Sequence, residues 1–310
     1  MTTQTLAEAK KLINNDIVEG VIEDIITLNP LFDQLPFTGY EGQGLILNRE
    51  NALGDSQVLA VDGTITAKAA ATFTSRTVTA TKLIGDAELD GLVAAQSSSA
   101  GVDQMAVEVS SKAKSVGRLF QTGMATGDGS TPNMNSFHSE VDASQFTTAS
   151  AGQVLSLTLL DELLDLVKAK DGEVDFIMMP ARTLRAYKVL IRALGGTSAD
   201  WTMTTDTGRI VSHYEQIPIF KNEYLSVVET ANGAAITGGA LTSVWAGCFD
   251  DGTQKIGVAG IHPEGVPAGI MVESVGPKEA KDDQIVRVKQ YANFANFNRR
   301  GLARLPSISN

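Results

Sequence analysis

Three histidines and one cysteine are the side chains of this sequence best suited to chemistry. His138, His213 and His262 are far apart in the chain, and none belongs to a His-Glu-x-x-His or His-x-His pattern. Cys248 lies in an apolar run with no histidine nearby, which favours core packing over nucleophilic catalysis. Since it is the only cysteine, an internal disulfide is excluded.

The other candidate motifs also favour structural roles. The segment Gly127-Asp-Gly-Ser-Thr-Pro132 lacks both the Lys-Ser/Thr of a phosphate loop and the acidic ladder of an EF-hand, so we predict a turn. Asp282 and Asp283 are expected to be solvated loop residues. No Gly-x-Ser-x-Gly elbow occurs, and no Gly-x-Gly-x-x-Gly follows a strand. We therefore predict a protein that is not an enzyme, with no catalytic, cofactor-binding or metal-binding residues.

The composition indicates a globular protein that does not bind nucleic acid broadly. The chain has 310 residues, of which 43% are hydrophobic and 20% charged, enough for one large domain or two smaller ones. Its net charge of -11 opposes the basic face that nucleic-acid binding needs. Beyond Gln284 every charge is positive. We expect these side chains to lie on a solvated or ion-paired strand face, with contact to acidic neighbours or subunits as the alternative: Arg287, Lys289, Arg299, Arg300 and Arg304.

Neither terminal nor internal segments resemble a secretion signal or a membrane span. The first residues contain no apolar stretch of the kind that signals secretion. The uncharged segment from Thr230 to Phe249 is too rich in Gly, Thr and Asn for a membrane helix, and a strand after a Gly-rich turn fits it better.

The first third of the chain predicts two extended features that one subunit would cover poorly. Apolar residues recur at helical spacing over 4–28, and Asn29-Pro30 ends this predicted amphipathic helix. Residues 43–84 predict a long hairpin, because its second arm is rich in Thr and Val. The connection at 50–71 has few large apolar groups and is expected to be a functional loop.

The middle of the chain predicts helices followed by an orderly apolar domain. Residues 85–125 read as helical, with apolar faces that include Leu92 and Leu119. The stretch from Leu155 to Leu225 reads helix, strand, helix and loop, and then Ile217-Pro-Ile-Phe-Lys-Asn222. Ser156 or Thr158 is expected to cap its first helix, the latter through a box with Asp161. Inward positions expected on the second helix are Leu184, Tyr187, Leu190, Ile191 and Leu194.

The tail alternates apolar and polar residues, which predicts two or three strands of a separate sheet. Together these elements indicate a mixed α+β class.

In their order and spacing, these parts resemble the major capsid proteins of tailed bacteriophages, whose fold is shared with encapsulin shells and the herpesvirus capsid floor. The predicted helix at 4–28 resembles the family's N-terminal arm, and residues 40–82 resemble its extended loop. The helix near 98–125 resembles the spine helix, and 158–194 with Gln216-Ile-Pro-Ile-Phe-Lys-Asn222 resembles the axial domain.

This resemblance implies five parts of the phage major capsid fold. They are an N-terminal arm at 1–39, an extended hairpin loop at 40–84, a peripheral domain with the spine helix at 85–150, an axial domain at 151–268, and returning strands of the peripheral domain at 269–310.

The resemblance also implies partners. We expect many copies of the chain, as pentamers and hexamers, to form an icosahedral shell around double-stranded DNA, in a virion assembled in the host cytoplasm. Scaffold, portal and decoration proteins are the other expected partners, whereas a membrane, a cofactor and sequence-specific contact with DNA are not expected. A scaffolding segment is expected either to have been removed already or to be a separate protein.

Two alternatives remain open, an encapsulin-type shell that stores a cargo enzyme and a soluble enzyme whose site is assembled from distant residues.

Some members of the capsid family form Lys–Asn cross-links between subunits, and Lys68 with Asn296 or Asn298 is the pair that would suit this.

Overall fold

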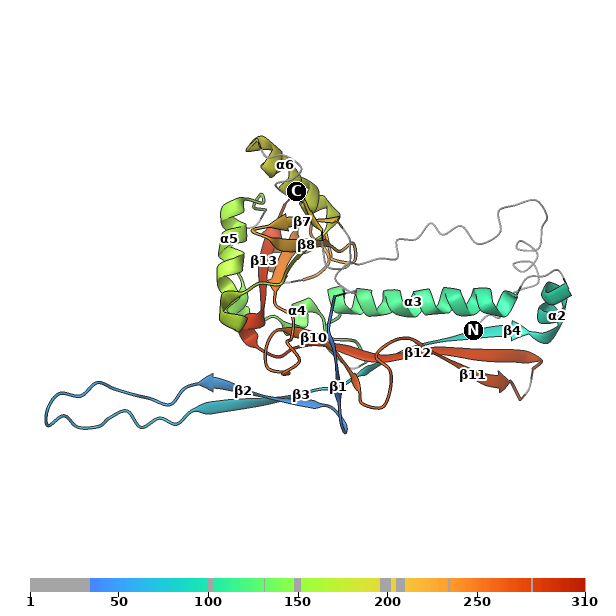
Figure 1. Cartoon of the computed structure of the whole chain (residues 1–310), viewed down its shortest axis with the longest axis horizontal. Helices are drawn as coiled ribbons and strands as arrows, with labels where there is room; N and C mark the ends of the chain where they lie inside the picture. The colour runs from blue at the N-terminus through green and yellow to red at the C-terminus, as the bar shows by residue number, and fades with distance from the viewer. Residues whose placement is uncertain are drawn as a thin grey trace.

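The computed structural model describes residues 34–99, 103–130, 132–147, 152–195, 202–204, 210–233, 235–279 and 281–309. The helix expected at 4–28 lies outside these ranges. The described part contains a five-stranded sheet, a six-stranded sheet and a separate two-stranded hairpin (Figure 1). No helix in these ranges is long and apolar enough to cross a membrane.

The five-stranded sheet is built around one long strand, β12, which pairs with β4 over ten positions from Asp283↔Asp90 to Ala292↔Thr81. On its other side β12 pairs with β11 and β10, and β1 adds in parallel to β10. The strands are β1 (Phe37–Tyr40), β4 (Thr81–Asp90), β10 (Val258–Pro263), β11 (Met271–Pro277) and β12 (Asp283–Asn296).

A long helix, α3 (Gln104–Thr126), lies along this sheet (Figure 1). It begins at Asp103, whose carboxylate accepts a hydrogen bond from the Ala106 amide at 3.1 Å. Val116, Phe120 and Met124 are spaced by four residues and are buried, so they fix the face that packs on the sheet. The long helix expected near 98–125 is therefore confirmed over the range of α3.

Two details of the helical prediction for 85–125 are wrong. Residues 85–90 belong to strand β4, where Ala87 and Leu89 are buried with the period of two that a strand requires. The following helix, α2, spans only Gly91–Ser99. Leu92 and Leu119 are both more than half exposed, since each lies one position away from a buried residue on its helix.

The six-stranded sheet has the order β13-β9-β5-β8-β7-β6 and is covered on both faces. Alternate residues of β5 divide between two cores, because Phe176 and Met178 join the core beneath α3 while Ile177 and Met179 join the core beneath α5. The strands are β5 (Phe176–Met179), β6 (Thr202–Thr204), β7 (Ile210–Tyr214), β8 (Ile217–Lys221), β9 (Thr242–Gly247) and β13 (Leu302–Ile308).

Two helices pack on the outer face of this sheet, α5 (Leu157–Leu166) and α6 (Ala181–Ala193). The N-cap of α5 is Ser156, whose hydroxyl accepts from the Leu159 amide at 3.3 Å. The alternative box at Thr158 is wrong, because Thr158 already lies within the helix. Leu194 was expected inward but is exposed, since it follows the last turn of α6.

Short helical segments complete the described chain between these elements. They are α4 (Phe137–Glu140), η1 (Ala143–Gln145), η2 (Ala169–Gly172), η4 (Ala231–Gly233) and η5 (Arg299–Gly301).

The separate sheet expected for the tail holds for β11 and β12, which pair with each other in the five-stranded sheet, but not for β13. Strand β13 pairs with β9 in the six-stranded sheet, while β12 belongs to the five-stranded one. Strand β10, in the range assigned to the axial domain, likewise pairs with β12. The chain thus crosses between the sheets more than once. It passes from the six-stranded sheet to the five-stranded sheet between β9 and β10, and it returns through the turn at η5 between β12 and β13.

The predicted hairpin is confirmed as β2 (Leu45–Ala52) paired with β3 (Thr72–Val78), from Leu45↔Val78 to Ala52↔Thr72. It projects from the body as a long arm (Figure 1). The second arm ends earlier than expected, and the chain continues directly into β4 of the body.

Candidate functional site

The hairpin carries a concentration of exposed apolar side chains, and five of them lie in the connection at 50–71, which was expected to have few. A folded chain usually buries such groups or scatters them singly, and an isolated two-stranded hairpin is marginally stable in water. Within the described residues its outer part has no helix or second sheet against it. The exposed residues, here called the hairpin surface, are Ile46, Leu53, Val58, Leu59, Val61, Ile65 and Phe73.

At its base the hairpin is held to the body by an ion pair between Arg76 on β3 and Glu140 on α4. Arg76 Nη1 donates to Glu140 Oε2 at 2.8 Å, and Nη2 donates to the other carboxylate oxygen. The Glu140 side chain is fully buried, and its Oε2 also accepts from the Asn296 amide at 3.2 Å. This two-pronged contact therefore fixes orientation as well as supplying attraction.

A second arginine, Arg49 on β2, joins the same hairpin to the end of β12. Its Nε donates to the Phe297 carbonyl at 3.2 Å, and its Nη2 donates to the Asn296 carbonyl. Burial lowers the pKa of Arg49, while Glu140 acts to raise it. The two hairpin strands are thus anchored to α4 and to the end of β12, which the hydrogen bond from Asn296 to Glu140 joins.

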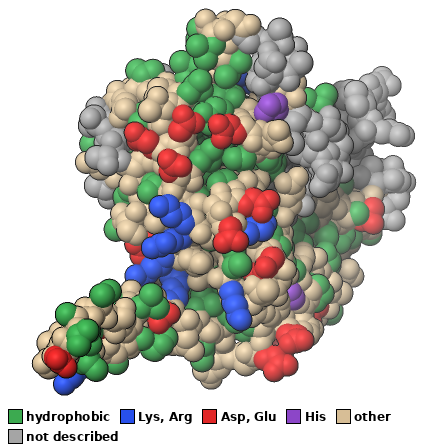
Figure 2. Space-filling model, turned by 60° about the vertical axis from the view of Figure 1, so that its left-hand side comes forward, with side chains coloured by type: hydrophobic (Ala, Val, Ile, Leu, Met, Phe, Trp, Pro, Cys, Tyr) green, Lys and Arg blue, Asp and Glu red, His purple; other side chains and the backbone are tan. Residues whose placement is uncertain are grey.

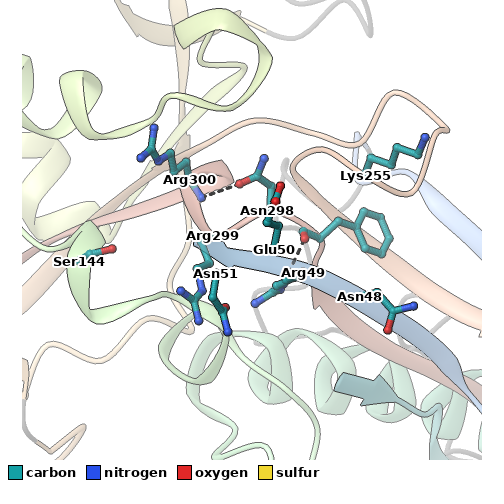
Figure 3. Close-up of a pocket in the computed structure, with 10 residues that line it drawn as sticks. Asn48, Arg49, Glu50, Asn51, Ser144, Lys255, Asn298, Arg299 and Arg300 are labelled. Carbon is teal, nitrogen blue, oxygen red and sulfur yellow. Dashed lines mark hydrogen bonds between the residues drawn. The ribbon is translucent and has the colours of Figure 1, made fainter. Parts of the chain in front are cut away.

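A pocket of about 490 Å³ lies beside this anchor (Figure 3). We call it the hairpin-base pocket. Lys and Arg side chains gather on the surface where the hairpin meets the body (Figure 2). Arg299 is paired with Asp142, with 3.2 Å between Nε and Oδ2. The lining residues come from β2, η1, the loop after β9 and the turn at η5: Asn48, Arg49, Glu50, Asn51, Ser144, Lys255, Phe297, Asn298, Arg299 and Arg300.

The three histidines occupy different elements. His138 lies on α4, where burial lowers its pKa to about 3, and its Nε2 is 3.5 Å from Glu229 Oε1. His213 is on β7, and His262 on β10 has its Nδ1 2.9 Å from the Val266 carbonyl oxygen. Among the described residues no group of three or more His, Cys, Asp or Glu side chains is placed to hold a metal ion.

The packing role expected for Cys248 is confirmed. Its thiol is buried, and Sγ lies 3.7 Å from the Gly301 carbonyl that accepts from it. Burial raises the pKa of this thiol to about 11, so it remains protonated and poorly nucleophilic at neutral pH.

The two loops singled out as candidate sites differ in outcome. The turn expected after the long helix is confirmed, because Asp128 Oδ1 accepts from the Ser130 amide at 2.9 Å and from Asn133 Nδ2 at 3.0 Å. The pair Asp282-Asp283 was expected to be solvated, but only Asp282 is exposed. Asp283 is buried at the start of β12, and its Oδ2 lies 3.7 Å from Lys278 Nζ.

The positive tail is ion-paired on β12, as expected for Arg287, whose Nε lies 2.8 Å from Asp86 Oδ1. Arg304 on β13 is likewise ion-paired, with Glu229, but it is buried and not solvated, at only 3% exposure. Its Nη2 donates to Glu229 at 3.0 Å, its Nε donates to Ser243 at 2.9 Å, and its guanidinium lies over the Trp245 ring. Burial raises the pKa of Glu229, whereas Arg304 acts to lower it.

The structure separates the two asparagines considered for cross-linking. Asn296 is buried, and its Nδ2 donates to the Glu140 carbonyl at 3.3 Å. Asn298 is half-buried beside the hairpin-base pocket, where its Oδ1 accepts from the Arg300 amide at 3.0 Å. Lys68 is exposed in the hairpin loop. Asn298 is therefore the more accessible of the two.

Sequence reasoning missed the residues that anchor the hairpin. Arg49, Arg76 and Glu140 belong to none of the motifs considered in the sequence. The only local signal is weak, because Glu140 is an acidic residue three positions after the apolar Phe137 in a short segment. Its partner, however, is 64 positions away, so only the folded chain reveals the pair.

Comparison with known proteins identifies the fold. No protein-family model matches the sequence. No curated protein matches it either. Solved structures do match over essentially the whole chain. The holo-SrpI encapsulin complex of Synechococcus elongatus PCC 7942 aligns with a TM-score of 0.71 at 17% identity, covering 100% of this chain and 97% of that chain.

Two capsids align similarly. The native GTA particle capsid gives a TM-score of 0.66 at 12% identity, with 100% of both chains covered. The cyanophage A-1(L) capsid aligns with a TM-score of 0.67 at 9% identity, covering 97% of this chain and 98% of that chain. The chain has the phage major capsid fold, of mixed α and β structure, which an encapsulin shares. The expected fold class is confirmed.

Proposed function

We propose that this chain is a major capsid protein that assembles into an icosahedral shell around the double-stranded DNA of a tailed bacteriophage. The observation that carries the proposal is the projecting hairpin, whose apolar surface is left uncovered on a body with a capsid fold. In a closed shell this surface would lie across a neighbouring copy. The chain then works by assembly and not as an enzyme, in a virion assembled in the host cytoplasm.

The proposed partners follow from the same role. Copies of the chain would meet as pentamers and hexamers, with scaffold, portal and decoration proteins as further components. Packaged DNA would be enclosed without sequence-specific contact, and the net charge of -11 would limit adhesion of DNA to the shell because like charges repel.

We also propose the five-part division as the functional organisation of the chain. The arm at 1–39 and the extended loop at 40–84 would reach neighbours, while 85–150 and 151–268 would form the bodies of the peripheral and axial domains. The segment 269–310 would return to the peripheral domain, except that β13 pairs with β9 and would join the axial domain. Conversely, β10 within 151–268 pairs with β12 and would join the peripheral domain.

A second candidate is an encapsulin-type shell that holds a cargo enzyme, favoured by the alignment with the SrpI encapsulin complex. The two candidate functions differ in what the shell encloses and not in how the chain assembles. Mass spectrometry and nuclease treatment of purified particles separate the two candidates. A stoichiometric ferritin-like or peroxidase protein indicates the encapsulin, and nuclease-resistant DNA indicates the capsid.

Negative-stain electron microscopy of the expressed chain, with and without a co-expressed scaffold, tests the proposal. We expect closed particles of uniform size. The variant Val61→Asp, which places a charge on the hairpin surface, is expected to reduce particle yield, whereas Val61→Ile keeps that surface apolar and serves as the control. A chain that stays monomeric in every salt and crowding condition, with and without scaffold, would contradict the proposal.

A further inference from the structure

We infer that the hairpin-base pocket binds carboxylates from a second copy of this chain. The inference rests on the proposed assembly and adds to it a specific contact beside the hairpin. The pocket lies at the root of the arm that reaches a neighbour, so an adjacent copy covering the hairpin would also close over the pocket (Figure 3).

The charges of the pocket are unbalanced. It is lined by Arg49, Lys255, Arg299 and Arg300 from β2, the loop after β9 and η5, with Lys255 and Arg300 on opposite sides (Figure 3), whereas Glu50 is the one carboxylate in the lining. Asp142 pairs with Arg299. Within the part of the chain that the structure describes, Lys255 and Arg300 have no ion-pair partner, and both are exposed.

Charges of both signs act on Arg49. Beyond the larger effect of burial, repulsion from Arg76 and Arg299 acts to lower its pKa, while Glu140 and Asp142 act to raise it. A carboxylate entering the pocket would relieve this repulsion and would find charge-assisted donors already positioned for it. The lining amides of Asn48 and Asn51 add neutral donors.

The carboxylate source that fits best is the chain itself. With 36 Asp and Glu against 25 Lys and Arg, the chain has a net charge that repels a phosphate backbone, and it offers more carboxylates than cations to its own copies. Exposed examples are Glu162 and Asp165 on α5. A volume of about 490 Å³ admits one or two side chains, whereas duplex DNA would contact only the rim.

Zero-length cross-linking tests this contact, because a carbodiimide joins a lysine amine to a carboxylate that touches it. Particles would be assembled from equal parts ¹⁴N- and ¹⁵N-labelled chain, treated, digested and analysed by mass spectrometry. We expect a peptide containing Lys255 joined to an acidic peptide of the other isotope. Lys255→Arg keeps the charge but lacks the amine, so it should assemble normally and lose this product.

Neutralisation of the pocket gives an independent measurement. We expect the double variant Lys255→Gln, Arg300→Gln to raise the protein concentration needed for assembly by about tenfold or more, as loss of close interfacial charge pairs does. The control Arg182→Gln, Arg185→Gln removes two exposed charges of α6 and should change the protein concentration needed for assembly by less than about twofold. Unchanged thermal unfolding of the unassembled chains would verify that both variants fold.

The outcomes are distinguishable. Particles that form normally without the mixed-isotope product, and without a requirement for Lys255 and Arg300, overturn the inference and leave the proposed function intact. Normal assembly of the double variant with a reduced nucleic-acid content would instead assign the pocket to phosphate, and also overturns it. No particles from the unmodified chain would refute the assembly itself, and the inference with it.

Discussion

The two residues of the ion pair at the root of the hairpin differ in their exposure to solvent. Glu140 is fully buried, whereas the Arg76 side chain is 35% exposed. Removing the arginine leaves a buried charge that water cannot reach, but removing the charge on Glu140 leaves an arginine that can still be hydrated. The consequence of a substitution therefore depends on which partner is changed.

We expect Arg76→Met to lower the free energy of unfolding by about 3 kcal/mol, the usual result of leaving a buried charge unpaired. Glu140→Gln should lower it by only about 1 kcal/mol, since the amide oxygen still accepts from Arg76. Chemical denaturation of the unassembled chain measures both values. Equal losses for the two variants would mean that the pair is as well hydrated as an ordinary surface ion pair.

His138 is a second residue whose burial has a measurable consequence. Its pKa of about 3 in the folded chain lies below the 6.5 of a free imidazole, and Arg304 adds to the effect of burial. As pH falls below 6.5 the unfolded chain binds a proton that the folded chain does not, so this group reduces stability toward acid. Glu229 faces it with a raised pKa and acts in the opposite sense, because the folded carboxyl is protonated first.

For this reason we expect His138→Phe to flatten the decline in stability between pH 6 and 4.5 by up to about 1.4 kcal/mol per pH unit. The variant keeps Glu229 and an aromatic ring against Trp245, so the difference from the unmodified chain isolates the imidazole. Denaturant unfolding at a series of pH values gives the slope, and His262→Phe on β10 is the matched control. Parallel pH profiles for His138→Phe and the unmodified chain would show that His138 takes up its proton in the fold.

At the scale of elements, the hairpin is separable from the body in a way that the other strands are not. Among the described strands, β2 and β3 pair only with each other, whereas β4, directly after β3, pairs with β12 through ten positions. Most residues of the loop at 53–71 are exposed. Its contribution to the fold of one subunit is therefore small.

Replacement of residues 53–71 by Asn-Gly, a sequence suited to a tight hairpin turn, is expected to leave the thermal unfolding of the unassembled chain unchanged. Assembly should be impaired, because most of the hairpin surface is removed while Arg49 and Arg76 remain. Light scattering and electron microscopy report the loss. Shells of normal yield and thermal resistance would contradict the role of the loop.

The whole molecule is joined by a core that both sheets share. Phe137 on α4 packs against Trp245 of the six-stranded sheet at 5.7 Å between ring centroids, and against Phe294 of the five-stranded sheet at 4.7 Å. All three rings are fully buried. We therefore expect the two sheets to unfold together and not as independent domains.

Phe137→Ala should lower the free energy of unfolding by about 3–5 kcal/mol while retaining a single transition. Phe73→Ala, on the exposed hairpin surface, removes the same atoms and should change it by less than about 0.5 kcal/mol in the unassembled chain. Tryptophan fluorescence and far-ultraviolet circular dichroism would follow the unfolding. Two separated transitions in Phe137→Ala would contradict a shared core.

Much of the local structure was predictable from the sequence, because periodicity is a property of neighbouring residues. The four-residue spacing of Val116, Phe120 and Met124 defined the long helix, and the Thr-rich run before residue 78 defined an arm of the hairpin. The same reasoning failed for residues 85–90, where a short apolar segment fits either a helix or a strand until its partner β12 is known.

The arrangement of these elements depended on the tertiary structure. Pairing of β13 with β9, and the contacts of Arg76 with Glu140 and Arg304 with Glu229, join residues that are distant in sequence. No local pattern encodes such partners, because burial of a charge is favourable only when the rest of the fold supplies its counter-ion. The sequence by itself thus determined the elements and the uncovered hairpin, and tertiary packing decided how that hairpin is anchored and where a basic pocket forms in an acidic chain.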